Sequence, residues 1–127
     1  MSQATEYVWS SRCLRRWVAA GYEAIMRYVR LAGTDLDVST VALGCGNFGG
    51  IGSVPELFGR GEDEAAAFAL MDAAGEHGIT LFDTANTYGG GRSEEWIGRW
   101  LASRGAREGV VLSTKVRNRV GPGPDAE

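Results

Sequence analysis

The order of short apolar runs and amphipathic segments is the feature that most constrains the fold of this chain. Apolar runs at residues 40–43, 79–82 and 110–112 have the length of buried strands. The two segments between them repeat apolar residues with helical spacing, at Ala67, Leu70, Met71 and Ala74 and at Trp96, Ile97, Trp100 and Leu101. Strands that alternate with helices predict an α/β fold in which helices cover a parallel sheet.

Acidic and turn-forming residues set the predicted ends of the helices. The acids at positions 62–64 favour the positive end of a helix dipole, and Gly78 is placed to end that helix. Ser93 is predicted to cap the second helix, which Gly105 ends. Before the first strand, residues 26–39 read as two short strands around a turn, which predicts a β-hairpin.

Polar side chains follow two of the apolar runs at the point where each strand ends. Asp83 and Tyr88 come after the second run, and Lys115 comes after the third. Strand ends form the catalytic face of a (β/α)8 barrel and the ligand crevice of a doubly wound sheet, so both folds bring these residues to one edge. A lysine lowers the pKa of a phenol beside it, and a carboxylate can hold that lysine. The three residues predict a proton donor, although a tyrosine at this spacing from an aspartate more often serves packing.

Composition argues against several classes of function. The chain has 127 residues, about one domain, and its net charge of −3 gives no reason to expect a nucleic-acid partner. No run approaches the roughly 18 apolar residues of a membrane span, and no secretory signal is expected. Two cysteines without metal-ligand spacing favour a reducing compartment, so we expect a cytoplasmic protein without a metal site.

Residues 1–25 differ in character from the sequence that follows. Residues 1–30 carry five arginines against two glutamates, and a short helix could gather Trp9, Trp17 and Val18 on one face. Such a basic amphipathic helix could lie on a membrane surface or contact a partner. The interpretation that we favour is an extension outside the fold, with residues 26–127 as the folded part.

The residues around the predicted site resemble those of one enzyme family. The run Phe-Asp-Thr-Ala-Asn-Thr-Tyr-Gly at residues 82–89, followed by Ser-Glu at 93–94, resembles the signature of the aldo-keto reductases. The Ser-Thr-Lys strand end at residues 113–115 and the Leu-Gly-Cys-Gly run at 43–46 match in the right order. The resemblance covers residues 26–127.

This resemblance implies a fold and a reaction. The family fold is a (β/α)8 TIM barrel, and the chain would be its N-terminal part, a hairpin followed by about three β/α units. The family reduces aldehydes and ketones, usually with NADPH, and NADH is the other option. The expected partner is therefore a small-molecule carbonyl compound.

The resemblance also implies residue roles. Tyr88 would donate the proton, Lys115 would stabilise the phenolate, and Asp83 would orient Lys115. Asp83 would also belong to the cofactor site. The remaining positions that match the nicotinamide end of that site are Gly46, Asn47 and Phe48.

Part of the family pattern is not found in this sequence. The family histidine would follow the next strand, beyond residue 127, whereas His77 ends the first predicted helix. We therefore expect a truncated reductase that is inactive on its own. The alternatives are a non-catalytic protein of the same fold that binds the cofactor for regulation, and a membrane-surface or interaction protein led by residues 1–25. The sequence specifies neither the carbonyl substrate nor the oligomeric state.

Overall fold

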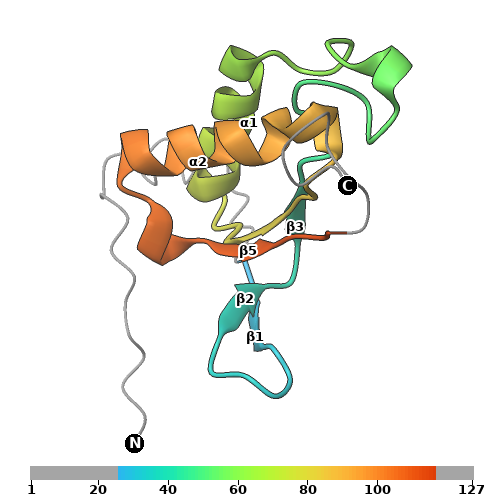
Figure 1. The fold of residues 1–127 in the computed structure, drawn as a ribbon. Coiled ribbons are helices and arrows are strands. Elements are labelled where there is room, and N and C mark those ends of the chain that lie inside the picture. Colours follow the sequence, from blue (N-terminus) through green and yellow to red (C-terminus); the bar gives the residue numbers. More distant parts are fainter. Residues whose placement is uncertain (1–25, 117–127) are drawn as a thin grey trace, which may run out of the picture.

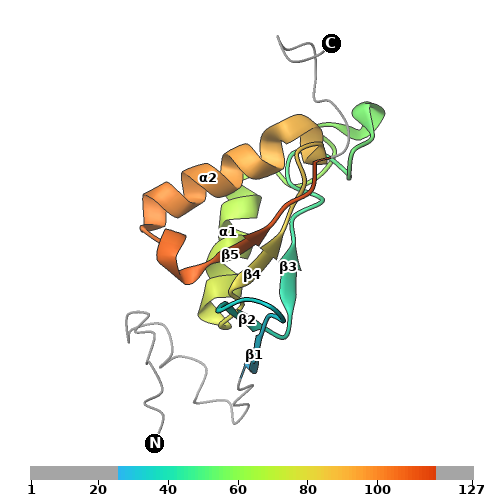
Figure 2. The ribbon, with the colours of Figure 1, turned by 60° about the horizontal axis from the view of Figure 1, so that its bottom comes forward.

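The structure, a computed structural model, describes residues 26–116 and centres on a parallel sheet. Its strands lie in the order β3-β4-β5, at Ala42–Gly44, Leu81–Asp83 and Val111–Ser113. Helix α1 (Glu64–Glu76) connects β3 to β4, and helix α2 (Arg92–Arg104) connects β4 to β5. Both helices cover the same face of the sheet (Figure 2), as right-handed crossovers require when strands are added in one direction. The predicted α/β arrangement is confirmed.

A β-hairpin precedes the sheet, as predicted, and lies near the start of its strands (Figure 1). Strand β1 (Tyr28–Arg30) pairs with the antiparallel strand β2 (Asp37–Ser39). The Ser39 amide donates to Thr80 Oγ1 at 3.1 Å, and the Thr80 amide donates to Ser39 Oγ at 3.0 Å. This reciprocal pair fastens the hairpin to the residue that precedes β4.

The core lies between the sheet and the two helices. Strand pleating turns alternate residues to opposite faces, and Leu43, Phe82 and Leu112 face the helices. Phe82 is fully buried, and its ring centre lies 5.6 Å from that of Trp100 on α2. The other buried apolar helix residues are Ala67, Met71 and Ala74 of α1 and Ile97 and Leu101 of α2. Because Phe82 faces this core, Asp83 must face the other way.

Most of the predicted helix ends are confirmed. The Asp63 side chain caps α1 by accepting a hydrogen bond from the Ala66 amide at 2.8 Å. His77 is the C-cap residue of α1, at the end of the helix opposite Asp63. Gly105 ends α2 in the left-handed conformation, with φ of 60°.

Two predictions about the helices are wrong. Leu70 is 41% exposed, because the buried stripe of α1 is narrow and Leu70 lies at its margin. Ser93 does not cap α2: the helix begins at Arg92, its N-cap is Gly91, and no side chain caps it. Ser93 instead lies buried in the first turn of α2, where it bonds to other segments.

Residues 1–25, and the interpretations that we place on them, lie outside the described residues. Within residues 26–116, neither α1 nor α2 combines the length and the apolar character needed to cross a bilayer. Both the extension outside the fold, which we favour, and the membrane-surface helix therefore stay untested.

Three consecutive glycines connect β4 and its loop to α2. Gly89, Gly90 and Gly91 have φ angles of 59°, 70° and 95°, in the left-handed region that favours glycine. A Cβ atom at Gly89 would also lie 2.3 Å from the carbonyl oxygen of Phe48. Both the backbone conformation and the close approach of the Phe48 loop therefore require glycine at position 89.

We expect Gly89→Ala to lower the free energy of unfolding by more than the ~1–2 kcal/mol cost of a left-handed alanine, because its methyl group would also overlap the Phe48 carbonyl. Gly98→Ala is the control. It lies within α2 with open space around it and should raise the free energy of unfolding by about 0.5–1 kcal/mol. Urea denaturation measures both changes, and a neutral or stabilising Gly89→Ala would contradict the strained turn.

Candidate active site

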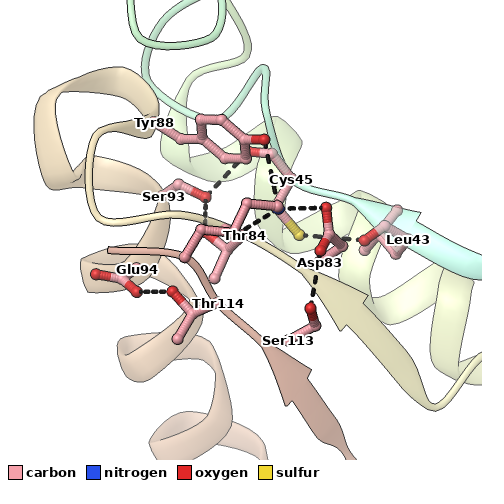
Figure 3. Close-up of polar contacts among 10 residues, drawn as sticks. Leu43, Cys45, Asp83, Thr84, Tyr88, Ser93, Glu94, Ser113 and Thr114 are labelled. Carbon is pink, nitrogen blue, oxygen red and sulfur yellow. Dashed lines mark hydrogen bonds and ion pairs between the residues drawn. The ribbon is translucent and has the colours of Figure 1, made fainter. Parts of the chain in front are cut away.

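The register of the sheet places Asp83 beside Ser113. Gly44, Asp83 and Ser113 are aligned across β3, β4 and β5, and each is the last residue of its strand. They face away from the helices because the residue before each one faces the core. The Ser113 hydroxyl donates to Asp83 Oδ1 at 3.0 Å (Figure 3). Gly44 adds no side chain on the other side of Asp83.

Lys115 brings the predicted residues together. Its ammonium donates to Asp83 Oδ2 at 2.7 Å and to the Thr84 carbonyl oxygen at 2.9 Å. The same Nζ lies 3.5 Å from the hydroxyl oxygen of Tyr88, which begins the 3₁₀ turn η4 (Tyr88–Gly91), and 5.2 Å from its ring centre. Asp83, Tyr88 and Lys115 therefore form one cluster at the carboxyl ends of β4 and β5. Their catalytic roles stay predictions.

Charge pairing shifts the pKa values of two members of this cluster. The hydrogen bond from Lys115 is the main cause that lowers the pKa of Asp83, with the Ser113 hydroxyl acting in the same direction. The hydrogen bond to Asp83 is the main cause that raises the pKa of Lys115. The side chains of Lys115 and Asp83 are 50% and 38% exposed. The pair is therefore charged at neutral pH, and its main effect is to orient Lys115 rather than to stabilise the fold.

The loop after β3 brings Gly46 close to Tyr88. A Cβ atom at Gly46 would lie 3.9 Å from the Tyr88 ring, so a larger side chain there would contact the ring. Asn47 is exposed, whereas Phe48 is 1% exposed and packs in the core. Of the three predicted cofactor positions in this loop, Gly46 and Asn47 are accessible to a ligand. The Phe48 side chain is not.

The sequence did not predict a buried pair of hydroxyls beside this cluster. Thr84 Oγ1 and Ser93 Oγ lie 2.8 Å apart, and the Ser93 hydroxyl donates to the Cys45 carbonyl at 2.9 Å (Figure 3). Nearby, the Thr114 hydroxyl donates to the Glu94 carboxylate at 2.5 Å. Ser93 and Glu94 form the Ser-Glu pair of the family signature, which is the signal in the sequence that places them near the predicted site.

Cys45, directly after β3, is fully buried. Burial is the main cause that raises the pKa of its thiol to about 12, and the charge of Asp83 acts in the same direction. The thiol is therefore neutral at physiological pH and unreactive. Among residues 26–116, no three His, Cys, Asp or Glu side chains gather where they could hold a metal ion.

Comparison with known proteins identifies the family of this chain. The model of the aldo/keto reductase family matches residues 41–126. The chain therefore belongs to the aldo/keto reductase family. The uncharacterized oxidoreductase YrpG of Bacillus subtilis is 45% identical over 96 residues, which cover 72% of this chain. Norsolorinic acid reductase B of Aspergillus parasiticus is 41% identical over 92 residues, also 72% of this chain.

A solved structure supports the same relationship. The holo form of the aldo-keto reductase AKR11C1 from Bacillus halodurans matches 79% of this chain with a TM-score of 0.61 and 34% identity, and 29% of that protein is covered. The chain spans about a quarter of the two curated relatives, 26% of YrpG and 23% of norsolorinic acid reductase B.

We expect Lys115→Met to raise the pKa of Asp83 toward its ordinary value, because the variant removes the main partner of the carboxylate. Carbon-detected NMR titration of the side-chain carboxyls measures this shift. Asp72 provides the control, since its pKa is lowered mainly by the hydrogen bond from Arg104. Arg104→Met should raise the pKa of Asp72 and leave that of Asp83 unchanged.

The same shift predicts how stability depends on pH. The pKa of Asp83 is lower in the folded than in the unfolded chain, so the pairing stabilises the fold above the unfolded-state pKa. This contribution is lost as the pH falls through the folded-state pKa, and Lys115→Met should remove it. A wild-type Asp83 that titrates at its ordinary value would contradict the pairing.

Proposed function

We propose that this chain is part of a reductase that converts aldehydes or ketones to alcohols with NADPH, or alternatively with NADH. The observation that carries the proposal is the position of Lys115 Nζ, which contacts both the Asp83 carboxylate and the Tyr88 hydroxyl. Membership of the aldo/keto reductase family supports the same class of reaction. A non-catalytic binding protein would not need these three functional groups in one cluster.

The chemistry assigns a role to each residue of the cluster. A nicotinamide cofactor held beside the cluster would supply the hydride that reaches the carbonyl carbon. As negative charge grows on the carbonyl oxygen, the Tyr88 hydroxyl donates its proton there. The Lys115 ammonium lies beside the phenol oxygen and stabilises the phenolate that remains. The Asp83 carboxylate and the Thr84 carbonyl hold Lys115 in this position.

The donor set fits a nicotinamide and a carbonyl group. The acidic, basic and phenolic side chains lie at the carboxyl ends of parallel strands, where α/β proteins bind ligands. We propose that Gly46, Asn47 and Asp83 contact the nicotinamide end of the cofactor, since Gly46 adjoins Tyr88 and Asn47 is exposed. NADPH is preferred to NADH on the family resemblance alone.

We further propose that residues 26–127 belong to a (β/α)8 barrel in a cytoplasmic protein. Two helices on one face of β3-β4-β5 suit a barrel and also one half of a doubly wound sheet. The family favours the barrel. Leu81 and Val111 are only half-buried on the face away from the helices, and the complete protein would cover that face in either fold. Residues 1–25 would lie outside this domain.

A chimera tests the proposal, with residues 26–127 replacing the equivalent segment of AKR11C1 from Bacillus halodurans. We expect the chimera to oxidise NADPH in the presence of aldehydes or ketones. Tyr88→Phe should lower kcat by at least ~100-fold, because a positioned general acid contributes roughly 10²–10⁴-fold. Cofactor affinity should change little, since the variant keeps the ring. Absorbance of the reduced cofactor and a binding titration measure the two effects.

Tyr28→Phe is the matched control for this experiment. Tyr28 lies on the hairpin and donates to the Gly78 carbonyl, at the end of the fold opposite the cluster. Loss of the Tyr28 hydroxyl should leave kcat unchanged. A Tyr88→Phe chimera with undiminished kcat would refute the proposed proton donor. A folded chimera that binds NADPH without turnover would favour the non-catalytic alternative.

A further inference from the structure

Three segments beside the cluster meet at one buried side chain, Ser93. Its hydroxyl lies in the first turn of α2 and contacts Thr84, directly after β4, and the carbonyl of Cys45, directly after β3. Figure 3 shows Ser93 between these two segments. Ser93 is 0% and Thr84 is 2% exposed, so water does not compete for these bonds.

The directions of the two hydrogen bonds that join Thr84, Ser93 and Cys45 are fixed by the Cys45 carbonyl. The Cys45 carbonyl can only accept, so the single Ser93 proton is donated to it. The bond between Thr84 and Ser93 must then use the Thr84 proton, with Ser93 Oγ as acceptor. The chain runs from the Thr84 hydroxyl through the Ser93 hydroxyl to the Cys45 carbonyl.

The two end residues of this series of hydrogen bonds, Thr84 and Cys45, also contact the surroundings of the cluster. The carbonyl oxygen of Thr84 is one of the acceptors that hold Lys115 Nζ. The carbonyl of Cys45 also accepts from the Phe48 amide at 3.2 Å, which closes the turn that contains Gly46. Gly46 adjoins the Tyr88 ring. The hydroxyls of Thr84 and Ser93 therefore connect the residue whose carbonyl binds Lys115 to the loop beside Tyr88.

We propose that Thr84 and Ser93 are positioning residues, whose hydroxyl chain fixes the Lys115 ammonium and the Gly46 loop relative to Tyr88. The inference rests on the proposed function for its catalytic meaning. Its structural content, that the buried hydroxyls control the pairing of Lys115 with Asp83, can be measured without turnover.

A purely structural role and a positioning role make different predictions. Losing a buried hydroxyl partner destabilises any fold, because the group left behind is desolvated and unpaired. A structural role would therefore lower stability without changing the cluster. A positioning role would in addition displace the Thr84 carbonyl, weaken the Lys115–Asp83 bond, and move the titration of Asp83.

The test is an NMR titration of the Asp83 carboxyl in variants of the 127-residue chain. Thr84→Val keeps the shape of the side chain and removes the hydroxyl, and Ser93→Ala removes the central link. We expect the pKa of Asp83 to move upward in both variants. Thr84→Ser keeps the hydroxyl and should restore the wild-type titration. Ser103→Ala, which removes the bond from Ser103 to the Trp100 carbonyl elsewhere on α2, should have no effect on Asp83.

The outcomes separate the two roles. An Asp83 titration that is unchanged in Thr84→Val and Ser93→Ala, with lowered thermal stability, would overturn the proposal. In the AKR11C1 chimera, Thr84→Val should lower kcat about tenfold or more, because small misplacement of catalytic groups is costly. The titration needs no activity, so a failure of the reductase proposal would not be mistaken for a failure of this one.

A second measurement tests the same proposal if Thr84→Val or Ser93→Ala does not fold. Coupling between two sites is reciprocal, so removing Lys115 must loosen the hydroxyl chain. Lys115 is half-exposed, and Lys115→Met is expected to fold. In that variant the hydroxyl protons of Thr84 and Ser93 should exchange with water faster than in the wild type. Equal exchange rates would contradict the proposed link.

Discussion

The parallel register of β3, β4 and β5 is the constraint on which the candidate site depends. Phe82 is fully buried against the helices, and a fully buried phenylalanine contributes roughly 1.5–3 kcal/mol to folding. A slip of one residue would expose Phe82 and push Asp83 into the core, where an ionised carboxylate is costly. The apolar core therefore decides that Asp83 faces away from the helices, in the same row as Gly44 and Ser113.

The cluster combines partly exposed polar side chains with hydrogen bonds to buried groups beneath them. The exposed pair of Lys115 and Asp83 contributes only about 0–1 kcal/mol, too little to fix a flexible lysine by itself. The Thr84 carbonyl adds a second acceptor that belongs to the backbone after β4. Beneath it, the hydroxyls of Thr84 and Ser93 are shielded from water. This arrangement leaves Tyr88 and Lys115 accessible while their surroundings are held by the core.

The sequence predicted the architecture because its main signals are local and periodic. The short apolar runs, the acids before α1 and the glycine after α2 each act on neighbouring residues, and the structure confirms the elements that they predicted. The gathering of Asp83 and Lys115 also followed, since the carboxyl ends of parallel strands share one edge. Tyr88 follows the same strand as Asp83, and the family signature was needed to favour a proton-donor role for it over packing.

The remaining features depend on contacts that are distant in the sequence. Ser93 has the chemistry of an N-cap, but its partner is the carbonyl of Cys45, 48 positions earlier, and Gly91 begins the helix instead. Phe48 follows Gly46 in the loop and was predicted to contact the cofactor, yet its ring fills the core. The apolar periodicity predicted which side of α1 is buried but not how wide the buried face is. That face is too narrow to include Leu70, which is exposed.

In the proposed mechanism, the Lys115 ammonium makes Tyr88 an effective proton donor. The most direct measurement is the kcat of the AKR11C1 chimera with Lys115→Met, with NADPH affinity measured in parallel. We predict that kcat falls by at least ~100-fold, as expected for the loss of an electrostatic contribution to the transition state, while the cofactor still binds. A Lys115→Met chimera that reduces its substrate at the undiminished rate would show that Lys115 does not assist proton donation by Tyr88.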